Sequence, residues 1–74
     1  MRRFTDRDGN NWEIVAGRES WGTIVALFIP AGDDVEIRQA PLEASGYETA
    51  TTRLEAMTPA DVQEMLDAST PKTL

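Results

Sequence analysis

The longest run of apolar residues in the chain, Ile24 to Ile29, restricts the fold more than any other feature. The run is far shorter than the roughly 20 residues that a membrane-spanning helix needs. Read as a strand, it places Val25, Leu27 and Ile29 on one face of a sheet and Ile24, Ala26 and Phe28 on the other. Apolar residues on both faces are typical of an inner strand that is covered on both sides. We therefore expect a central strand over residues 22–29.

A hairpin is predicted before this strand. Two segments with strand character, Arg2–Asp6 and Asn11–Gly17, flank the turn residues Arg7-Asp8-Gly9. A two-residue loop would pair Phe4 with Glu13, whereas a three-residue loop pairs Phe4 with Trp12 and keeps both aromatic residues on one face. The three-residue loop also needs a left-handed residue, which glycine supplies most easily, at Gly9.

A second three-residue turn, Pro30-Ala31-Gly32, is expected after the central strand, with Gly32 in the left-handed position. The fourth strand would then run over residues 35–40 and stop at Pro41. In this register Leu27 lies opposite Val35 and Val25 lies opposite Ile37, so that apolar residues meet.

Helical spacing begins after residue 42. A capping box is expected in Ser45-Gly46-Tyr47-Glu48, followed by a helix with the apolar stripe Tyr47, Ala50, Leu54 and Met57. A second helix starts with Thr58 as N-cap and Pro59 at the first helical position, buries Val62, Met65 and Leu66, and ends near Ala68. The predicted fold class is α+β, a four-stranded antiparallel meander followed by a C-terminal helical hairpin. Residues 1–68 form one domain, and residues 69–74 form a tail.

Common catalytic chemistry has few candidates in this composition. The chain contains no cysteine and no histidine, which excludes thiol nucleophiles, imidazole bases and most zinc sites. The adjacent carboxylates Asp33 and Asp34 fall in an expected surface turn, and the single lysine, Lys72, falls in the tail. The segment from Asp6 to Asn10 has the composition of a calcium loop but the glycine spacing of a turn. We expect no enzyme activity, no metal and no cofactor.

Acidic residues dominate the later part of the chain. The formal net charge is −6; residues 1–20 balance to zero, whereas residues 21–74 carry nine acidic and three basic side chains. Such a surface repels phosphate backbones, which argues against direct nucleic-acid binding, and is compatible with a basic protein partner. No secretory signal or membrane span is apparent, so a cytoplasmic location is expected.

A partner surface is predicted on one face of the central strand. The helical hairpin can cover only one face, and the register above favours the side of Val25, Leu27 and Ile29. Ile24 and Phe28 would then remain exposed as an apolar strip, with Trp21 at its end and Glu36 and Arg38 as its polar rim. The alternative is that the first two strands curl over this strip and bury it.

Four stretches of the sequence share a pattern with other proteins: Arg2-Arg3-Phe4 with Asp6, Asp8-Gly9, residues 12–22 (WEIVAGRESWG) and residues 26–30 (ALFIP). They resemble a group of short uncharacterised bacterial proteins over about half of the chain. The resemblance implies no particular activity.

Three functions remain open. We expect a non-catalytic protein–protein interaction module, an accessory or stabilising subunit of a larger assembly; small size and acidity also fit the small subunits of bacterial photosynthetic reaction-centre or antenna complexes. The first alternative is a free-standing acidic regulator that binds a basic protein. The second is a binder of small ligands or a minor enzyme, which would need a deep apolar pocket.

Overall fold

In the described part of the chain, five antiparallel strands form one sheet in the order β1-β2-β3-β4-β5, and two helices accompany it. The computed structural model describes residues 2–18, 22–32 and 36–72. The elements are β1 (Arg2–Thr5), β2 (Asn11–Arg18), β3 (Ile24–Pro30), β4 (Arg38–Pro41), α1 (Tyr47–Ala56), α2 (Pro59–Asp67) and β5 (Thr70–Pro71). The predicted α+β class, with a four-stranded meander followed by two helices, is confirmed. A fifth strand follows the helices where a tail was expected.

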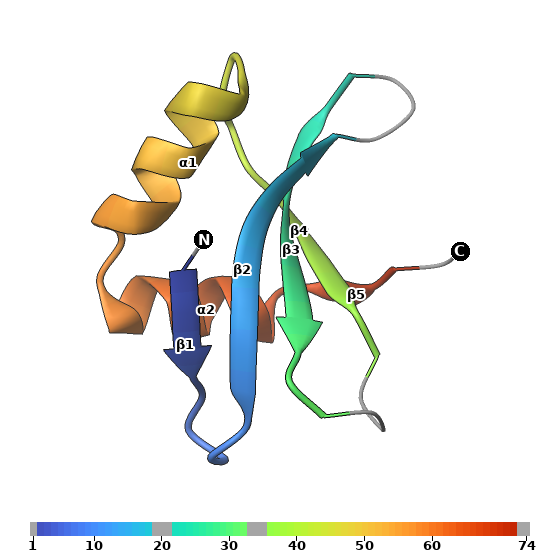
Figure 1. Cartoon of the computed structure of the whole chain (residues 1–74), viewed down its shortest axis with the longest axis vertical. Helices are drawn as coiled ribbons and strands as arrows, with labels where there is room; N and C mark the ends of the chain where they lie inside the picture. Colours follow the sequence, from blue (N-terminus) through green and yellow to red (C-terminus); the bar gives the residue numbers. More distant parts are fainter. Residues whose placement is uncertain (1, 19–21, 33–35, 73–74) are drawn as a thin grey trace.

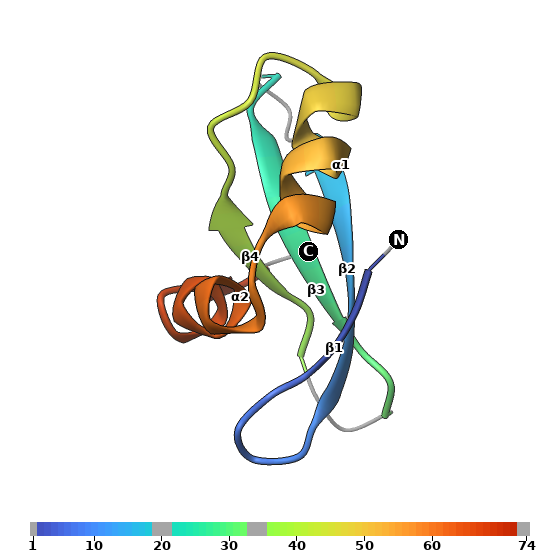
Figure 2. The same cartoon turned by 90° about the vertical axis from the view of Figure 1, so that its left-hand side faces the viewer.

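Both helices lie on the same side of the sheet, so the fold has two layers (Figure 1). The buried residues of both helices belong to one core cluster with Ile14, Ala26 and Phe28 of the sheet. In Figure 2, α1 is drawn in front of the strands, and α2 lies below α1. This arrangement gives the sheet a helix-covered face and a second face, which we call the open face.

The first hairpin has the predicted register. Phe4 is paired with Trp12, and the backbone N–H of Gly9 donates to the Asp6 carbonyl over 3.1 Å. Gly9 has a φ of +85°, the left-handed conformation that the three-residue loop requires. The local turn residues therefore determine how β1 and β2 are aligned.

The predicted register between β3 and β4 is wrong by four residues. Leu27 pairs with Gln39 and Val25 pairs with Pro41, while Val35 lies outside the described residues. Gly32 does not have a positive φ, so the expected tight turn does not form there. The observed register brings Ala40 and Leu42 into the core beneath the helices, and this burial favours the later alignment.

The core lies between the helices and the face of the sheet that carries Ile24, Ala26 and Phe28. Phe28 is fully buried, and its ring meets Trp12 edge to face with 6.4 Å between the centroids. The other members of this cluster are Ile14, Ala40, Leu42, Ala50, Leu54, Val62 and Leu66. The prediction that the helices cover the side of Val25, Leu27 and Ile29 is therefore wrong.

The two helices begin in different ways. The Thr58 hydroxyl accepts from the backbone N–H of Asp61 over 3.2 Å, and Pro59 occupies the first turn of α2, as predicted. In α1 the N-cap is Gly46, which has no side chain to accept a hydrogen bond, so the predicted capping box is wrong. Tyr47 is 45% exposed instead of buried, and the Arg18 guanidinium lies over its ring at 5.1 Å.

The C-terminal segment is tied to the edge of the sheet. Ser69 is buried, and Arg38 donates to its hydroxyl over 2.7 Å and to its carbonyl over 2.6 Å. The backbone N–H of Lys72 donates to the Ile37 carbonyl over 2.9 Å. These bonds explain why Thr70 and Pro71 form a strand although their sequence has no strand pattern.

Candidate functional site

The residues predicted as a partner interface are not together on a surface. Ile24 is 4% exposed and Phe28 is 0% exposed, because both helices pack on their side of the sheet. Arg38 is engaged with Ser69, Glu36 is exposed, and Trp21 lies outside the described residues. Ile24 and Phe28 are therefore core residues and do not form the exposed strip that was predicted.

The apolar residues of the opposite face form a different candidate surface. Strand alternation and the observed pairing place Val15, Val25, Leu27 and Ile29 on the open face, and we call these four residues the open-face patch. Val15 lies directly opposite Leu27, and both are half-buried, as is Ile29. No helix or strand among the described residues packs over this patch. It is an apolar area at the centre of a sheet.

Close packing within the sheet holds the patch in place. A Cβ atom at Gly17 would lie 2.5 Å from Cδ1 of Leu27, so the Leu27 side chain occupies the space over the Gly17 backbone. Val25, the residue paired with Gly17, is only 5% exposed, yet it does not belong to the main core cluster. Gly17 therefore allows Leu27 and Val25 to settle onto the open face beside each other.

Polar side chains border the patch. Arg3 and Glu13 face each other across β1 and β2, with 4.0 Å between the charged groups, and both side chains are accessible to solvent. On the β4 side, the Oε1 atom of Gln39 is buried and has no hydrogen-bond partner among the described residues. Gln39 is paired with Leu27, so this unsatisfied acceptor adjoins the patch. An apolar centre with a polar border is the usual composition of a protein-binding surface.

Charged side chains lie on both layers of the described protein. Exposed acidic residues of the α1–α2 region are Glu43, Glu48, Glu55, Asp61, Glu64 and Asp67, against a single basic residue, Arg53. The ladder of the open face carries Arg3 and Glu13, and Lys72 shares that face through its pairing with Ile37. Arg7 pairs with Asp67, and Arg2 donates to the carbonyls of Leu54 and Met57, so basic side chains offset part of the acidic charge on the helical layer.

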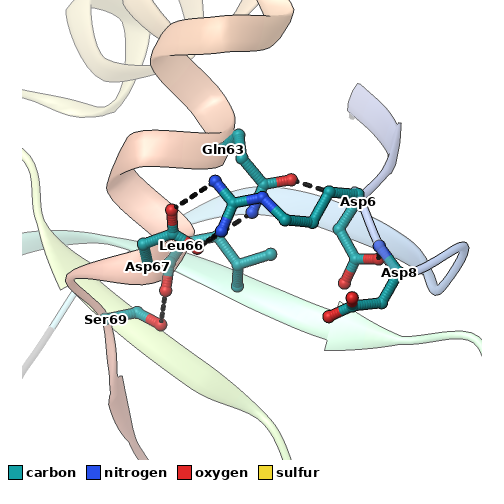
Figure 3. A network of polar contacts seen from close by, with 7 residues as sticks. Asp6, Asp8, Gln63, Leu66, Asp67 and Ser69 are labelled. Atoms are coloured by element: carbon teal, nitrogen blue, oxygen red, sulfur yellow. Dashed lines mark hydrogen bonds and ion pairs between the residues drawn. The ribbon is translucent and has the colours of Figure 1, made fainter.

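A polar network joins the β1–β2 turn to α2 (Figure 3). Gln63 and Asp67 of α2 extend toward the turn that carries Asp6 and Asp8. Arg7 donates through both terminal nitrogens to the Asp67 carboxylate, at 2.8 and 3.3 Å, and its backbone N–H donates to Gln63 over 2.9 Å. The network is exposed and fixes the hairpin against the helix.

Asp6 organises the turn itself. Its carboxylate accepts from the backbone N–H groups of Asp8 and Asn10 at 2.9 and 2.8 Å, and from the Trp12 indole at 2.9 Å. Partial burial by itself raises the pKa of the Asp6 carboxyl. The hydrogen bonds from Trp12 and from the turn outweigh this effect and hold that pKa below its usual value of 3.8. Asp6 therefore has a structural role in the hairpin.

One groove of the molecule lies along α1. It has a volume of about 700 Å³, is open to solvent and has a mainly apolar lining surface, to which Ala56 and Met57 contribute beside Glu48, Arg53 and Asp61. Within residues 2–18, 22–32 and 36–72, no three acidic side chains lie close enough together to hold a metal ion. Neither helix of this part of the chain has the length and hydrophobicity needed to cross a membrane.

Comparison with known proteins adds no relative: no family model, curated protein or solved structure matches this sequence. The open-face patch is the strongest candidate site, and three of its four residues lie in the apolar run noted in the sequence. Val15 and its neighbour Gly17 were not singled out. Pairing β2 with β3 residue by residue would have identified them, because it places Val15 opposite Leu27 and Gly17 opposite Val25.

Proposed function

We propose that this protein is a non-catalytic protein–protein interaction module that binds its partner through the open-face patch. The observation that carries the proposal is a central strand with apolar side chains on both faces, of which the helices cover one. Val15, Leu27 and Ile29 are only half-buried, and a partner that covers them would remove their remaining apolar surface from water. Packing of Leu27 over Gly17 supports the proposal further, because a preformed surface loses little entropy on binding.

The shape of the surface favours a protein over a small ligand. Val15, Leu27 and Ile29 stand on neighbouring positions of a pleated sheet, whereas small-molecule sites are concave and enclose most of their ligand. A second sheet or a helix can pack on such a surface over its whole length. Polar residues at its border, Arg3, Glu13 and Gln39, would then orient the partner.

A second candidate function uses the other face. The six exposed acidic side chains of the helical layer favour an acidic regulator that binds a basic protein. Attraction of this kind acts between exposed charges and weakens as salt is added. Binding through the apolar patch, in contrast, persists at high salt.

Photo-crosslinking in the native cell tests the proposal. A photoreactive phenylalanine analogue replaces Ile29 in the patch or, as the matched control, exposed Thr52 on α1. We expect a discrete protein adduct from position 29 that persists at high salt, and none from position 52. An adduct from position 52 alone, lost at high salt, would support the acidic regulator instead. The absence of any adduct from position 29 would refute the proposed function.

A further inference from the structure

We infer that the outer edge of β1 binds an extended, acidic segment of a partner protein, which adds a strand to the sheet beside β1. The inference goes beyond the proposed function, because it concerns the edge of the sheet and not the open-face patch. Three features of β1 support it: its backbone groups, the charge of its side chains and the groove beside it.

Alternation along the first hairpin determines which backbone groups of β1 face outward. The backbone N–H of Asp6 donates to the Asn10 carbonyl over 2.9 Å. Bonded positions recur at every second residue of an antiparallel pair, so Phe4 also directs its N–H and C=O groups toward β2. The backbone groups of Arg3 and Thr5 alternate with these positions and therefore point away from the sheet.

The pairing on the other side of β2 agrees with this pattern. The carbonyl of Asn11, the residue opposite Thr5, accepts from the backbone N–H of Ala31 over 3.0 Å, on the side of β3. Among the described residues, no hydrogen bond involves the backbone groups of Arg3 or Thr5, and both residues are exposed. Two N–H and two C=O groups are thus available, and an extended backbone can pair with all four.

The opposite edge of the sheet is less suited to such pairing. β5 consists of Thr70 and Pro71, and a proline has no backbone N–H to donate. β1 contains four residues and no proline. In Figure 1, β1 forms the end of the described sheet next to β2. The free side of β1 is therefore where a further strand can be added.

The charge at this edge favours an acidic partner. The Arg3 side chain is 86% exposed and its Nε atom lies 4.0 Å from the Glu13 carboxylate, so this exposed pair holds the guanidinium weakly. Arg2 donates to the backbone carbonyls of Leu54 and Met57, which carry no formal charge to neutralise it. Positive side chains on an edge strand repel basic strands and favour a strand with carboxylates opposite them.

A groove of about 480 Å³ beside β1 provides room for the side chains of such a segment. It is lined by Arg3, Phe4 and Thr5 of β1 and by residues of β2 that include Glu13. Phe4 is half-buried, so an apolar residue opposite it would cover its exposed part. The neighbours of that residue lie opposite Arg3 and Thr5, on the other face. The favoured segment therefore has an apolar residue opposite Phe4 and a carboxylate opposite Arg3.

NMR titration of the full chain with the heptapeptide acetyl-TVEVEVT-amide, which has this pattern, tests the inference. The amide signals of Arg3 and Thr5 should shift and become protected from hydrogen exchange, whereas the signal of Phe4, already bonded to β2, should change less. The same peptide N-methylated at both glutamates cannot donate to β1 and should bind about tenfold more weakly or worse. The control peptide, N-methylated at its central valine, has lost only an N–H that points away from β1 and should bind within about threefold of the parent.

Substitutions on β1 separate the backbone from the side chains. Thr5→Pro removes the outward N–H without removing a bond to β2 and should weaken peptide binding about fivefold or more, while Thr5→Val keeps this N–H and should bind nearly as well as the unmodified chain. Arg3→Glu should weaken binding of the acidic peptide and strengthen binding of the lysine counterpart, acetyl-TVKVKVT-amide.

Three results would overturn the inference, and all are measured on the unmodified chain even if a variant fails to fold. The first is the absence of binding at millimolar peptide, and the second is equal affinity for the peptide and its glutamate-methylated form. The third is a shift of the Arg3 and Thr5 signals when the chain alone is concentrated, which would assign the edge to a second copy. Crosslinking from position 29 does not depend on these results, so the proposed function stands or fails separately.

Discussion

Removal of the Asp6 carboxylate should destabilise the first hairpin. In the structure this group accepts three close hydrogen bonds, two from the turn backbone and one from the Trp12 indole. Asp6→Ala leaves the two backbone N–H groups to water, since the turn is exposed, but it leaves the indole N–H partly buried without an acceptor. Asp8 is the matched control, because its side chain lies in the same turn and is exposed.

The expected magnitude follows from these bonds. A lost bond at an exposed backbone N–H costs about 0.5 kcal/mol, and an unsatisfied, partly buried indole N–H costs about 1–2 kcal/mol. Asp6→Ala should therefore lower the free energy of unfolding by about 2–3 kcal/mol. A domain of this size has a total of about 4–11 kcal/mol, and each kilocalorie corresponds to about 4–8 °C in Tm. The loss should appear as a fall in Tm of roughly 10–20 °C, against a change of about 0.5 kcal/mol or less for Asp8→Ala.

The pH dependence provides a second test of the same group. The folded-state pKa of Asp6 lies below its ordinary value of 3.8, so the ionised carboxylate stabilises the fold above that value. This stabilisation is lost as the pH falls through the lowered, folded-state pKa. Asp6→Asn removes the titration and should flatten the stability profile in that window, while Asp8→Asn should not.

The assay combines thermal denaturation, followed by circular dichroism, with the NMR signal of the Trp12 indole N–H. That signal should move with the titration of Asp6 in the folded protein and should stay fixed in Asp6→Asn. The reasoning would be refuted by equal Tm values for Asp6→Ala and Asp8→Ala, or by an indole signal that does not change with pH while the protein remains folded.

Three further substitutions test the packing. Leu54→Ala removes a side chain that is 2% exposed between α1 and the sheet, and should lower the free energy of unfolding in urea by about 2–5 kcal/mol; an unchanged midpoint would contradict the core described above. Gly9→Val places a β-branched residue at a φ of +85° and should lower the free energy of unfolding, measured by thermal melting, by about 1 kcal/mol or more. An unchanged melting temperature would contradict the left-handed conformation at this position. Gly17→Ala brings a Cβ atom within 2.5 Å of Leu27 Cδ1, so the Leu27 methyl signals should shift in NMR spectra, and unmoved signals would show that the two residues are not in contact.

The elements that could be predicted from the sequence are those determined by local chemistry. The β1–β2 register follows from a glycine that must adopt a positive φ and from two aromatic residues, Phe4 and Trp12, that must share a face. The start of α2 follows from a threonine N-cap and a proline, Thr58 and Pro59, at fixed positions. Each signal lies within a few residues of the structure that it determines.

The features that were missed depend on contacts distant in the sequence. A shift of four residues between β3 and β4 leaves every side chain on the same face, so the alternation of the strands cannot distinguish the two registers. The choice depends on Ala40 and Leu42 reaching the core under the helices. β5 likewise could not be predicted from local sequence, because it depends on the hydrogen bond between Arg38 and Ser69, which are 31 positions apart.

The face that the helices cover could have been inferred if three strands had been considered instead of two. In β2 the helix-side residues are Trp12, Ile14 and Ala16, and the residues that alternate with them are Glu13, Val15 and Gly17. The β2–β3 register pairs Ile14 with Phe28 on one face and Val15 with Leu27 on the other. The face of Phe28 also carries Trp12, so it buries more apolar area and is the one expected to form the core.

The weaker set, Val15 with Val25, Leu27 and Ile29, is therefore the apolar surface that remains once the helices have covered the other face. Part of this set also stabilises the fold of the single chain, because Val25 is only 5% exposed and Leu27 packs over Gly17. The exposed parts of Val15, Leu27 and Ile29 are what the proposed partner would cover. Leu27→Thr should therefore lower the free energy of unfolding of the isolated protein in urea and also weaken crosslinking to the partner from position 29. Crosslinking that stays unchanged would mean that Leu27 serves only the fold of its own chain.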